Sequence, residues 1–403
     1  MMKLSYYRVN KIFWIWTRCE GKDGCEIVRD ATLSMGKAPP SLPEPPKKPE
    51  PPKPRPRRLT HKDRVNNTFD GLLAAAEGIS RFKKWLNTPD PPKEHKPAPV
   101  KKQEKESTVP PFDIQEIPRA MRKIFLPKSA ELMERWFAGR LNYSPVDADE
   151  GAEINQDGKH YPPDMYDTTT IKLDWVFRFP RAKEKYDYLI NEGIRSQNAI
   201  DVLTKMLGTY KNQVIDLFTG DICRNNPVTL HRNFQFQRVA VDGTFGQKIN
   251  LLLAAEWERS GAPDDLTGAL GSFVIYAALG RAQFSWDVEW RRTVVEVTGI
   301  WVYVKDNYTF TDKLGDRSQY LGHWSSNGVI VVPLDTFAAQ SRYIPYVKSA
   351  VALGNPATKG NVYYPVHNAD FRQWAIKHQR GGDFIIYSDC RYVPVSPSIK
   401  IYL

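Results

Sequence analysis

The sequence has few cysteines and no long apolar run. Its 403 residues contain four Cys, too few for a disulfide-stapled scaffold. No stretch reaches the roughly 18–20 consecutive apolar residues that a membrane helix requires. The apolar run 12–16 is shorter than the roughly seven to fifteen residues of a secretory signal. We therefore expect a chain that is made in the cytoplasm and has no transmembrane segment, so that any export would need a route independent of a signal peptide.

Motifs of common cofactor sites are also missing. The sequence has no phosphate-binding loop, no dinucleotide-binding glycine pattern, no zincin helix and no Gly-x-Ser-x-Gly elbow. Cys19 and Cys25 lack the nearby second pair that a structural zinc site needs. These absences exclude several large enzyme classes, and the cofactor stays unknown, with Mg²⁺ as one candidate that the Asp306 loop raises below.

Positive charge is concentrated at one end of the chain. The net charge is +11, from 57 Lys and Arg against 46 Asp and Glu. Residues 1–112 hold 23 of these cations against 13 anions, and the rest of the chain holds 34 against 33. The body is therefore electrically balanced, and its composition does not predict a nucleic-acid-binding surface. We expect no specific nucleic-acid partner.

The first 112 residues read as a tail. They contain 17 of the 31 prolines, and Pro39–Arg58 reads PPSLPEPPKKPEPPKPRPRR. Proline fixes φ and removes backbone donors, which favours an extended polyproline-II spacer. A second Pro-rich stretch covers residues 89–111, and helical spacing predicts one amphipathic helix at about 65–87. We expect a largely disordered tail, used as a linker or as a docking segment for a partner.

The remaining residues predict an α+β body. Residues 113–262 read as mainly helical with one strand near 170–179, where apolar and polar residues alternate. Residues 263–403 read as mainly antiparallel β with two late helices, which favours a curved sheet or half-barrel. The expected helices cover 129–137, 181–191, 196–210, 214–218, 246–260, 334–351 and 368–378. The expected strands cover 171–179, 273–278, 282–289, 293–304, 324–332, 383–392 and 398–402.

One loop after a predicted strand combines several reactive side chains. It contains Asp306, Tyr308, Asp312, Arg317 and His323. Asp306 and Asp312 are carboxylates of the kind that hold Mg²⁺, which uses few protein ligands. Arg317 is suited to a phosphate, and His323 to acid–base chemistry. The alternative is an ordinary Asp- and Gly-rich hairpin loop, so these five residues are candidates for catalysis.

A second group surrounds the start of a late helix. His367 and Asp370 flank Asn368, which fits an N-cap, and Asp370 then complements the helix dipole. Capping explains this group without function, and His367 and Asp370 stay secondary catalytic candidates.

A third group lies near the carboxyl end. Asp389 and Arg391 alternate onto one strand face, which predicts that they pair with each other. Cys390 between them is a candidate for a thiol–imidazole couple with His367 or His378. The sequence offers no sign that the thiol and either imidazole meet.

Part of the body resembles a known family. The residues that carry this likeness are Ile117-Pro118-Arg-Ala-Met121, Ala130 to Phe137, Tyr308 to Trp324, and Asn368 to Arg372. Together they resemble a family of uncharacterised bacterial proteins encoded near the VgrG and PAAR spike genes of type VI secretion systems. The resemblance covers about residues 113–403 and carries no established catalytic residue. It implies a secreted antibacterial effector, or an accessory of the secretion spike.

A shorter segment resembles a toxin. Gly271-Ser-Phe273 and Asp306-Asn-Tyr308-Thr-Phe310 look similar to the catalytic sheet of colicin M-type bacteriocins. That resemblance implies magnesium-assisted cleavage of the lipid-linked peptidoglycan precursor. The family motif is Asp-x-Tyr-Asp followed by His-Arg. Here Thr309 replaces the second Asp and Asp316-Arg317 lies where His-Arg is expected, so Asp312 and His323 would have to substitute.

Two functions of different classes follow. The first is a type VI effector, a toxin acting on the envelope of a target bacterium, with a cognate immunity protein as a partner. The second is a non-catalytic adaptor or structural accessory that binds the VgrG/PAAR spike, or another adaptor, through its tail. Membrane disruption by the 66–86 helix or by residues 264–279 is a third possibility.

Overall fold

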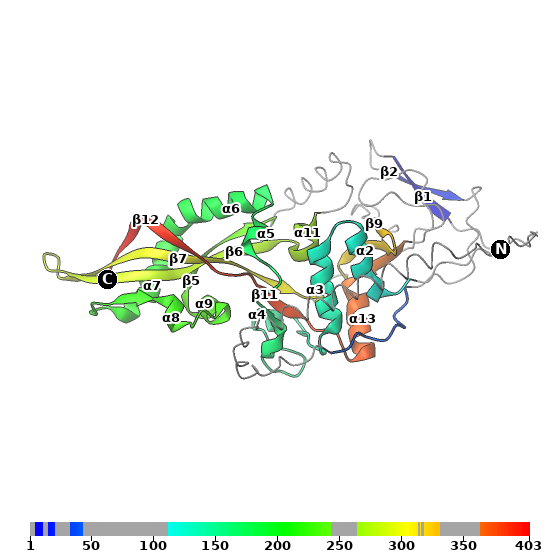
Figure 1. Ribbon diagram of the computed structural model, residues 1–403, viewed down its shortest axis with the longest axis horizontal. Helices are drawn as coiled ribbons and strands as arrows, with labels where there is room; N and C mark the ends of the chain where they lie inside the picture. Colours follow the sequence, from blue (N-terminus) through cyan, green and yellow to red (C-terminus); the bar gives the residue numbers. More distant parts are fainter. Residues whose placement is uncertain are drawn as a thin grey trace, which may run out of the picture. The chain divides into compact units, whose positions relative to one another are not determined.

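The computed structural model describes residues 5–10, 15–20, 33–42, 112–242, 264–312, 315, 318–330 and 363–403. All of these fall in one of the two units into which the chain divides, residues 1–43 with 107–403. Helices dominate its first part, and a curled mixed sheet that forms a half-barrel dominates the second (Figure 1). The predicted α+β class is thereby confirmed. Among these residues no helix is both long and apolar enough to cross a bilayer.

The helices lie mainly between residues 114 and 234, as the sequence predicts. The longer ones are α2 Ile117–Lys123, α3 Pro127–Ala138, α6 Pro180–Asn191, α7 Gln197–Leu207, α9 Pro227–Phe234 and α13 Asn368–His378. The short ones are α4 Asp147–Gly151, α5 Leu173–Val176, α8 Thr219–Ile222 and α11 Asp265–Leu270. Single 3₁₀ turns cover Ile114–Glu116, Pro163–Met165, Gly193–Arg195 and Gly208–Tyr210.

Helix α3 begins earlier than predicted. Its first residue is Pro127, and Leu126 is the N-cap. Proline suits this position because its φ is already helical and the missing N–H would have no partner in the helix. Ser129, predicted as the N-cap, is instead a fully buried residue of the first turn. The predicted end of the helix at Gly139 is confirmed.

The strand predicted at 171–179 is wrong. Leu173–Val176 forms the short helix α5, and α6 follows from Pro180. In an alternating pattern every second apolar residue is four positions from the next, and residues at i and i+4 share one face of a helix. The same pattern therefore fits a helical turn. The rings of Trp175 and Phe179 use that spacing and meet edge to face, 5.5 Å apart. The turn is anchored by Asp389, whose Oδ1 accepts the N–H of Leu173 at 2.7 Å.

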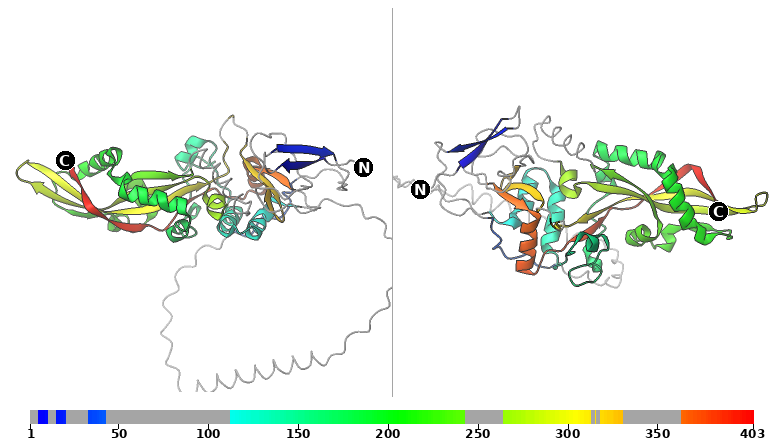
Figure 2. Two further views of the ribbon diagram at one scale, coloured as in Figure 1. Left: turned by 90° about the horizontal axis from the view of Figure 1, so that it is seen from above. Right: turned by 180° about the vertical axis from the view of Figure 1, so that it is seen from behind.

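The largest sheet has seven strands. They are β3 Tyr166–Asp167, β4 Asp216–Phe218, β5 Gln235–Val241, β6 Phe273–Asp287, β7 Arg292–Tyr308, β11 Phe384–Tyr387 and β12 Arg391–Tyr402. The order is β3-β11-β7-β6-β4, with β12 also on β7 and β5 also on β6. The β3–β11 pair is parallel and the other pairs are antiparallel. Figure 2 shows the long β6–β7 pair extending away from the α2, α3 and α13 helices.

Three segments differ from the predicted sheet. The short helix predicted at 214–218 is wrong, because Asp216–Phe218 pairs with β6 as β4. Strand β5 was not predicted, and it joins the mainly helical part of the chain to the sheet. The strands predicted at 273–278 and 282–289 are one strand, β6, with a bulge at Gly280. A Cβ at Gly280 would lie 2.8 Å from the Gly299 carbonyl oxygen, so only glycine fits this close approach.

A second, three-stranded sheet comprises β8 Tyr320–Ser325, β9 Gly328–Ile330 and β10 Tyr364–His367. The strand predicted at 324–332 is therefore two strands with a turn between them. The strand predicted at 383–392 is also divided, because Ser388 leaves the ladder. Its Oγ accepts the N–H of Val304 at 2.9 Å. The strand predicted at 398–402 is the end of β12. A separate hairpin pairs β1 Ser5–Asn10 with β2 Ile15–Glu20.

The core joins α3, α13 and the sheet around Trp136. Its ring lies 4.9 to 5.7 Å from those of Phe137, Phe310, Phe371 and Trp374. The Trp136 Nε1 donates to the fully buried Asp383 at 2.8 Å. Aromatic clusters of this kind contribute strongly to core stability and fix the positions of the elements that supply them.

Several predictions lie outside the described residues. These are the helices at 65–87, 246–260 and 334–351 and most of the Pro-rich stretches, 43–58 and 89–111.

Candidate functional site

A cavity of about 940 Å³ opens at the end of β7. Its described walls come from α2, α3 and α11 on one side, β7 and the residues after it on another, and α4 and β8–β9. Of the predicted catalytic residues, Asp306, Tyr308 and Asp312 all line it. The structure thus brings three of the five main candidates into one solvent-reachable space.

The register of the sheet explains why the cavity lies here. Strand β6 pairs with β7 only as far as Lys305, opposite Val274. Strand β11 on the other side continues the pairing of β7 to Tyr308. Residues 306–308 therefore have a described strand neighbour on one side only, and this open edge borders the cavity.

Asp306 is the most perturbed carboxyl of the cavity. It is half-buried, and burial raises the pKa of its carboxyl well above the usual value because the charged form loses solvation. The nearby Glu150 carboxylate raises this pKa further, whereas the Asn307 N–H and Lys305 oppose the rise. The net effect favours the protonated carboxyl.

Glu150, on α4, is in a different environment. Its two oxygens accept hydrogen bonds from Asn307 Nδ2 at 3.0 Å and from Thr309 Oγ1 at 3.2 Å. These bonds fix the orientation of the Glu150 carboxyl at the cavity wall. The cavity therefore contains two carboxyl groups whose surroundings differ.

Aromatic stacking fixes the strand end that carries Asp306. Tyr308 stacks on Phe384 of β11 with centroids 5.0 Å apart. Phe310 stacks on Phe371 of α13 at 3.9 Å, with an interplanar angle of 6°. Burial also raises the pKa of the Tyr308 phenol, which keeps it neutral. Tyr308 thus contributes a neutral phenol to the wall and is not a base.

His323 lies away from the described cavity wall. His323 is fully buried, and its Nδ1 lies 2.5 Å from Tyr320 Oη. It is not among the described residues that line the cavity. Arg317 lies outside the described residues. Asp312 accepts the N–H of Gln319 at 3.0 Å, which closes the loop.

The group at the start of α13 caps the helix. The cap is His367, one residue before the predicted Asn368, and its N–H donates to Asp370 Oδ2 at 2.7 Å. Asn368 is buried, and its Nδ2 donates to the Thr311 carbonyl at 3.3 Å. The helix start therefore holds the loop that contains Asp312, and neither His367 nor Asp370 lines the cavity.

The third predicted group does not assemble as expected. Asp389 binds the backbone of α5, and Arg391 pairs with Asp174 at 2.5 Å, so the two do not pair with each other. Cys390 lines a separate cavity of about 380 Å³ together with Cys223. Burial raises the pKa of Cys390 to about 12, and the described lining there contains no histidine.

The sequence prediction missed a polar cluster on β7. His231 Nδ1 lies 2.9 Å from Tyr303 Oη, and the rings of Tyr276 and Tyr387 lie 4.8 and 5.9 Å from His231. Burial lowers the pKa of His231 to about 4, and Lys305 adds to the effect, so the imidazole is neutral at pH 7. The members of this cluster come from four segments that are distant in the sequence. The alternation of residues along β7 is therefore the one sequence signal that points to it.

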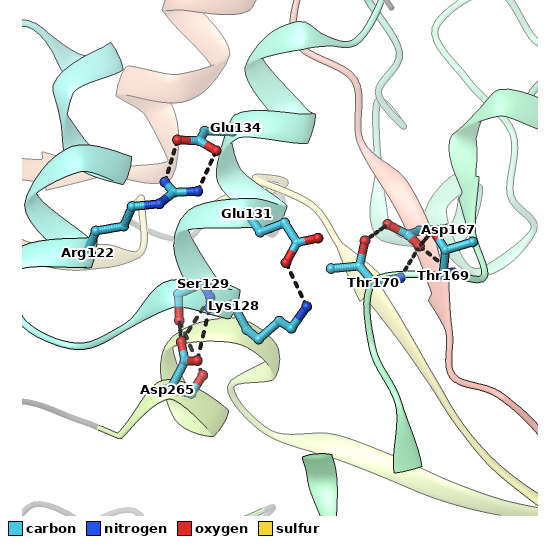
Figure 3. Close-up of polar contacts among 9 residues, drawn as sticks. All are labelled: Arg122, Lys128, Ser129, Glu131, Glu134, Asp167, Thr169, Thr170 and Asp265. Carbon is cyan, nitrogen blue, oxygen red and sulfur yellow. Dashed lines mark hydrogen bonds and ion pairs between the residues drawn. The ribbon is translucent and has the colours of Figure 1, made fainter. Parts of the chain in front are cut away.

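The wall opposite β7 is anchored through carboxylates. Figure 3 shows the Asp265 side chain at the first turn of α3. It accepts the N–H groups of Lys128 and Ser129 at 2.9 and 3.0 Å and the Ser129 hydroxyl at 2.8 Å. Arg181 of α6 holds the preceding Asp264, with Nη2 to Oδ1 at 2.8 Å. These contacts fix α11, whose residues form the wall.

The described lining of the cavity is acidic. Its described lining includes four carboxyl groups, those of Asp147, Glu150, Asp306 and Asp312, and no Lys, Arg or His. Across the described part of the chain no three His, Cys, Asp or Glu side chains converge as a metal-binding group. The predicted Mg²⁺ pair, Asp306 and Asp312, is therefore not accompanied by a third such ligand there.

The comparisons with known proteins identify a family but no function. No curated protein and no solved structure matches the chain. The model of a family of unknown function, DUF6402, matches residues 112–403. This match covers the whole body and begins where the proline-rich tail ends. The chain belongs to the DUF6402 family.

Proposed function

We propose that this protein is an antibacterial effector of type VI secretion that acts as a toxin on the envelope of a target bacterium. The resemblance of its body to proteins encoded beside VgrG and PAAR genes supports the delivery route. The cavity at the end of β7 supports an enzymatic activity. In this proposal the cavity is the reaction site, and Asp306 is its proton donor.

The half-buried carboxyl of Asp306 is the observation that carries the proposal. A carboxyl with a raised pKa keeps its proton at a higher pH than an exposed one, and can give it to a leaving group. Proton transfer by such a group typically accelerates a reaction by about 10²- to 10⁴-fold. Perturbed carboxyls of this kind are concentrated at active sites.

Glu150 supplies the complementary role. Its oxygens accept hydrogen bonds from Asn307 and Thr309, which fix the direction of this carboxyl in the cavity wall. Two carboxyls in contrasting environments are a recurring arrangement for acid and base in hydrolases. We assign Asp306 to protonation of the leaving atom and Glu150 to activation of the attacking water.

A colicin M-like reaction is the alternative. It requires a pyrophosphate to enter a cavity whose described lining carries carboxyls and no cationic side chain. Magnesium would have to neutralise that repulsion, since like charges in a confined site are unfavourable. His323, which the resemblance needs as a substitute, is fully buried beside Tyr320. The hydrolase with Asp306 as the acid is therefore the favoured proposal.

Delivery involves the basic first 112 residues. We propose that the chain is made in the producer's cytoplasm and that this tail docks the VgrG/PAAR spike or an adaptor. A cognate immunity protein would protect the producer by covering the cavity.

Compartment-specific expression tests this proposal. The chain is expressed in a laboratory bacterium with and without an added periplasmic signal. We expect lysis only with the signal, and loss of lysis in Asp306→Asn. Asp187→Asn, which removes a half-exposed carboxylate of α6 that pairs with Lys183, is the matched control and should stay toxic. If neither compartment gives toxicity, the effector proposal fails and the adaptor function is favoured.

A further inference from the structure

An apolar patch lies at the opposite end of β7 from the cavity. Its four exposed side chains are Trp286, Val288 and Trp290, at and just before the β6–β7 turn, and Tyr402 near the end of β12. The sheet brings the two segments together. Trp286 pairs with Thr293 at the start of β7, and Tyr402 pairs with the next residue, Val294. We call these four side chains the tip patch.

The β6–β7 turn presents the most exposed part of the patch. Its four residues, 288–291, follow the end of β6. Asp287 Oδ1 accepts the Trp290 N–H at 3.0 Å, and Arg291 has a φ of 48°, so hydrogen bonding and a left-handed residue together define the turn. Figures 1 and 2 show the turn projecting beyond α7 and β12. Val288 and Trp290 are 80% and 65% exposed, so folding of the body leaves them in contact with water.

Guanidinium groups accompany the apolar side chains. The guanidinium of Arg292 lies 3.9 Å from the centre of the Tyr402 ring and 5.5 Å from that of Trp290. Arg291 is exposed in the turn itself. These two cations are balanced by Asp287 and Glu289, so the segment 287–292 has no net charge. The tip therefore combines large apolar groups, donors suited to phosphate and overall neutrality.

The form of the tip favours a lipid bilayer over a protein partner. A stable protein interface takes about 800 Å² from each partner, contributed by roughly 20–30 residues. A turn of four residues that projects from its neighbours offers much less area. A bilayer needs no complementary surface, because apolar side chains enter the boundary between headgroups and acyl chains. Tryptophan is enriched at that boundary, where its ring is partly in apolar and partly in polar surroundings.

From these features we infer that the β6–β7 turn docks the chain on a phospholipid bilayer. Val288 enters the edge of the acyl region, the Trp290 ring lies at the level of the headgroups, and Arg291 faces lipid phosphate. Because the tip is neutral, the binding is driven by apolar burial and needs no anionic lipid. The inference rests neither on the cavity nor on the proposed function.

Vesicle binding by the full chain tests the inference. The probe is a vesicle of phosphatidylcholine, which has phosphate groups but no net charge, in about 0.5 M salt. At this ionic strength the Debye length is only about 4 Å, so attraction between the basic first 112 residues and the lipid is screened. We expect the chain to sediment with these vesicles, and we expect its partition coefficient to change little between about 0.1 and 0.5 M salt.

Variants of the tip locate the contact. Val288→Ser with Trp290→Ser should lower the partition coefficient at least about tenfold, because two large apolar groups no longer enter the bilayer. The matched control is Phe125→Ser with Ile376→Ser, which removes two exposed apolar side chains of the helical part and should leave binding unchanged. Val288→Trp should raise binding about threefold or more, and a gain of this kind cannot result from misfolding. The urea midpoints of the tip variants should equal that of the parent chain.

Three results would overturn the inference. The first is no binding of the parent chain to phosphatidylcholine vesicles, and the second is equal binding by the parent chain and the double tip variant. The third is a dimer of the parent chain without lipid that the double tip variant fails to form, which would assign the patch to a second copy of the chain.

Discussion

Replacing Asp265 by alanine tests how the wall of the cavity is held. Asp265 is 8% exposed and accepts three hydrogen bonds from Lys128 and Ser129 at the amino end of α3. Two of the donors are N–H groups that have no partner inside the helix. A hydrogen bond to a charged acceptor contributes about 1.5–3 kcal/mol, and loss of a helix cap costs about 1 kcal/mol.

These contributions overlap, because the same carboxylate serves all three donors. Some of the loss is recovered when water reaches the end of the helix. We therefore expect Asp265→Ala to lower the free energy of unfolding by about 3 kcal/mol. Close packing at this contact agrees with a large effect, since a Cβ at Gly268 would lie 2.5 Å from Ser129 Oγ.

Urea unfolding at neutral pH measures this cost. The matched control is Glu134→Ala, which removes from α3 an ion pair with Arg122 of α2, drawn in Figure 3. Both side chains of that pair are about half exposed, at 46% and 51%, so its loss should cost about 0.5 kcal/mol or less. If Asp265→Ala costs no more than Glu134→Ala, the account of how α11 is anchored is wrong.

Three further predictions concern other contacts of the body. Arg181→Met should lower the free energy of unfolding by about 2 kcal/mol, because it leaves the buried Asp242 carboxylate and the partly exposed Asp264 carboxylate without this partner; an unchanged urea midpoint would refute this. Gly280→Ala should cost about 2–3 kcal/mol, because the added methyl meets rigid backbone, whereas Gly208→Ala, which meets nothing within 4 Å, should be nearly neutral. Asp306→Asn should become more stable relative to the parent chain as pH rises from about 4 to 8. The folded state holds the Asp306 proton more tightly than the unfolded state, so this carboxyl's contribution to stability falls as pH rises through that interval; parallel stability curves for the two proteins would contradict the raised pKa.

The sequence allows the fold class and most long elements to be predicted. The helices α6, α7 and α13 follow from periodicity, and β7 from alternation. The errors occur where a local pattern fits two structures. Residues 171–179 satisfy both periods, and the helical turn that forms is held at Leu173 by Asp389, which lies more than 200 residues away in the sequence.

The candidate site was predictable only in part. Asp306, Tyr308 and Asp312 lie within seven residues of each other after one strand, so their meeting required no knowledge of the fold. Glu150 comes from a short helix with no periodic signal, and it reaches the site through Asn307 and Thr309. His323 lies in a strand of the second sheet, whose pairing with β10 buries it. The spacing of residues in the sequence could not show that the His323 side chain is buried in this sheet and not in the cavity wall.

The central claim is that Asp306 is the acid of an envelope-degrading enzyme. The most direct test incubates the purified chain with isolated bacterial envelopes and measures the rate at which soluble fragments are released. We predict release of fragments by the parent chain and by Asp187→Asn. For Asp306→Asn we predict a rate that is lower by a factor of about 100 or more. Equal rates for Asp306→Asn and the parent chain would contradict the account.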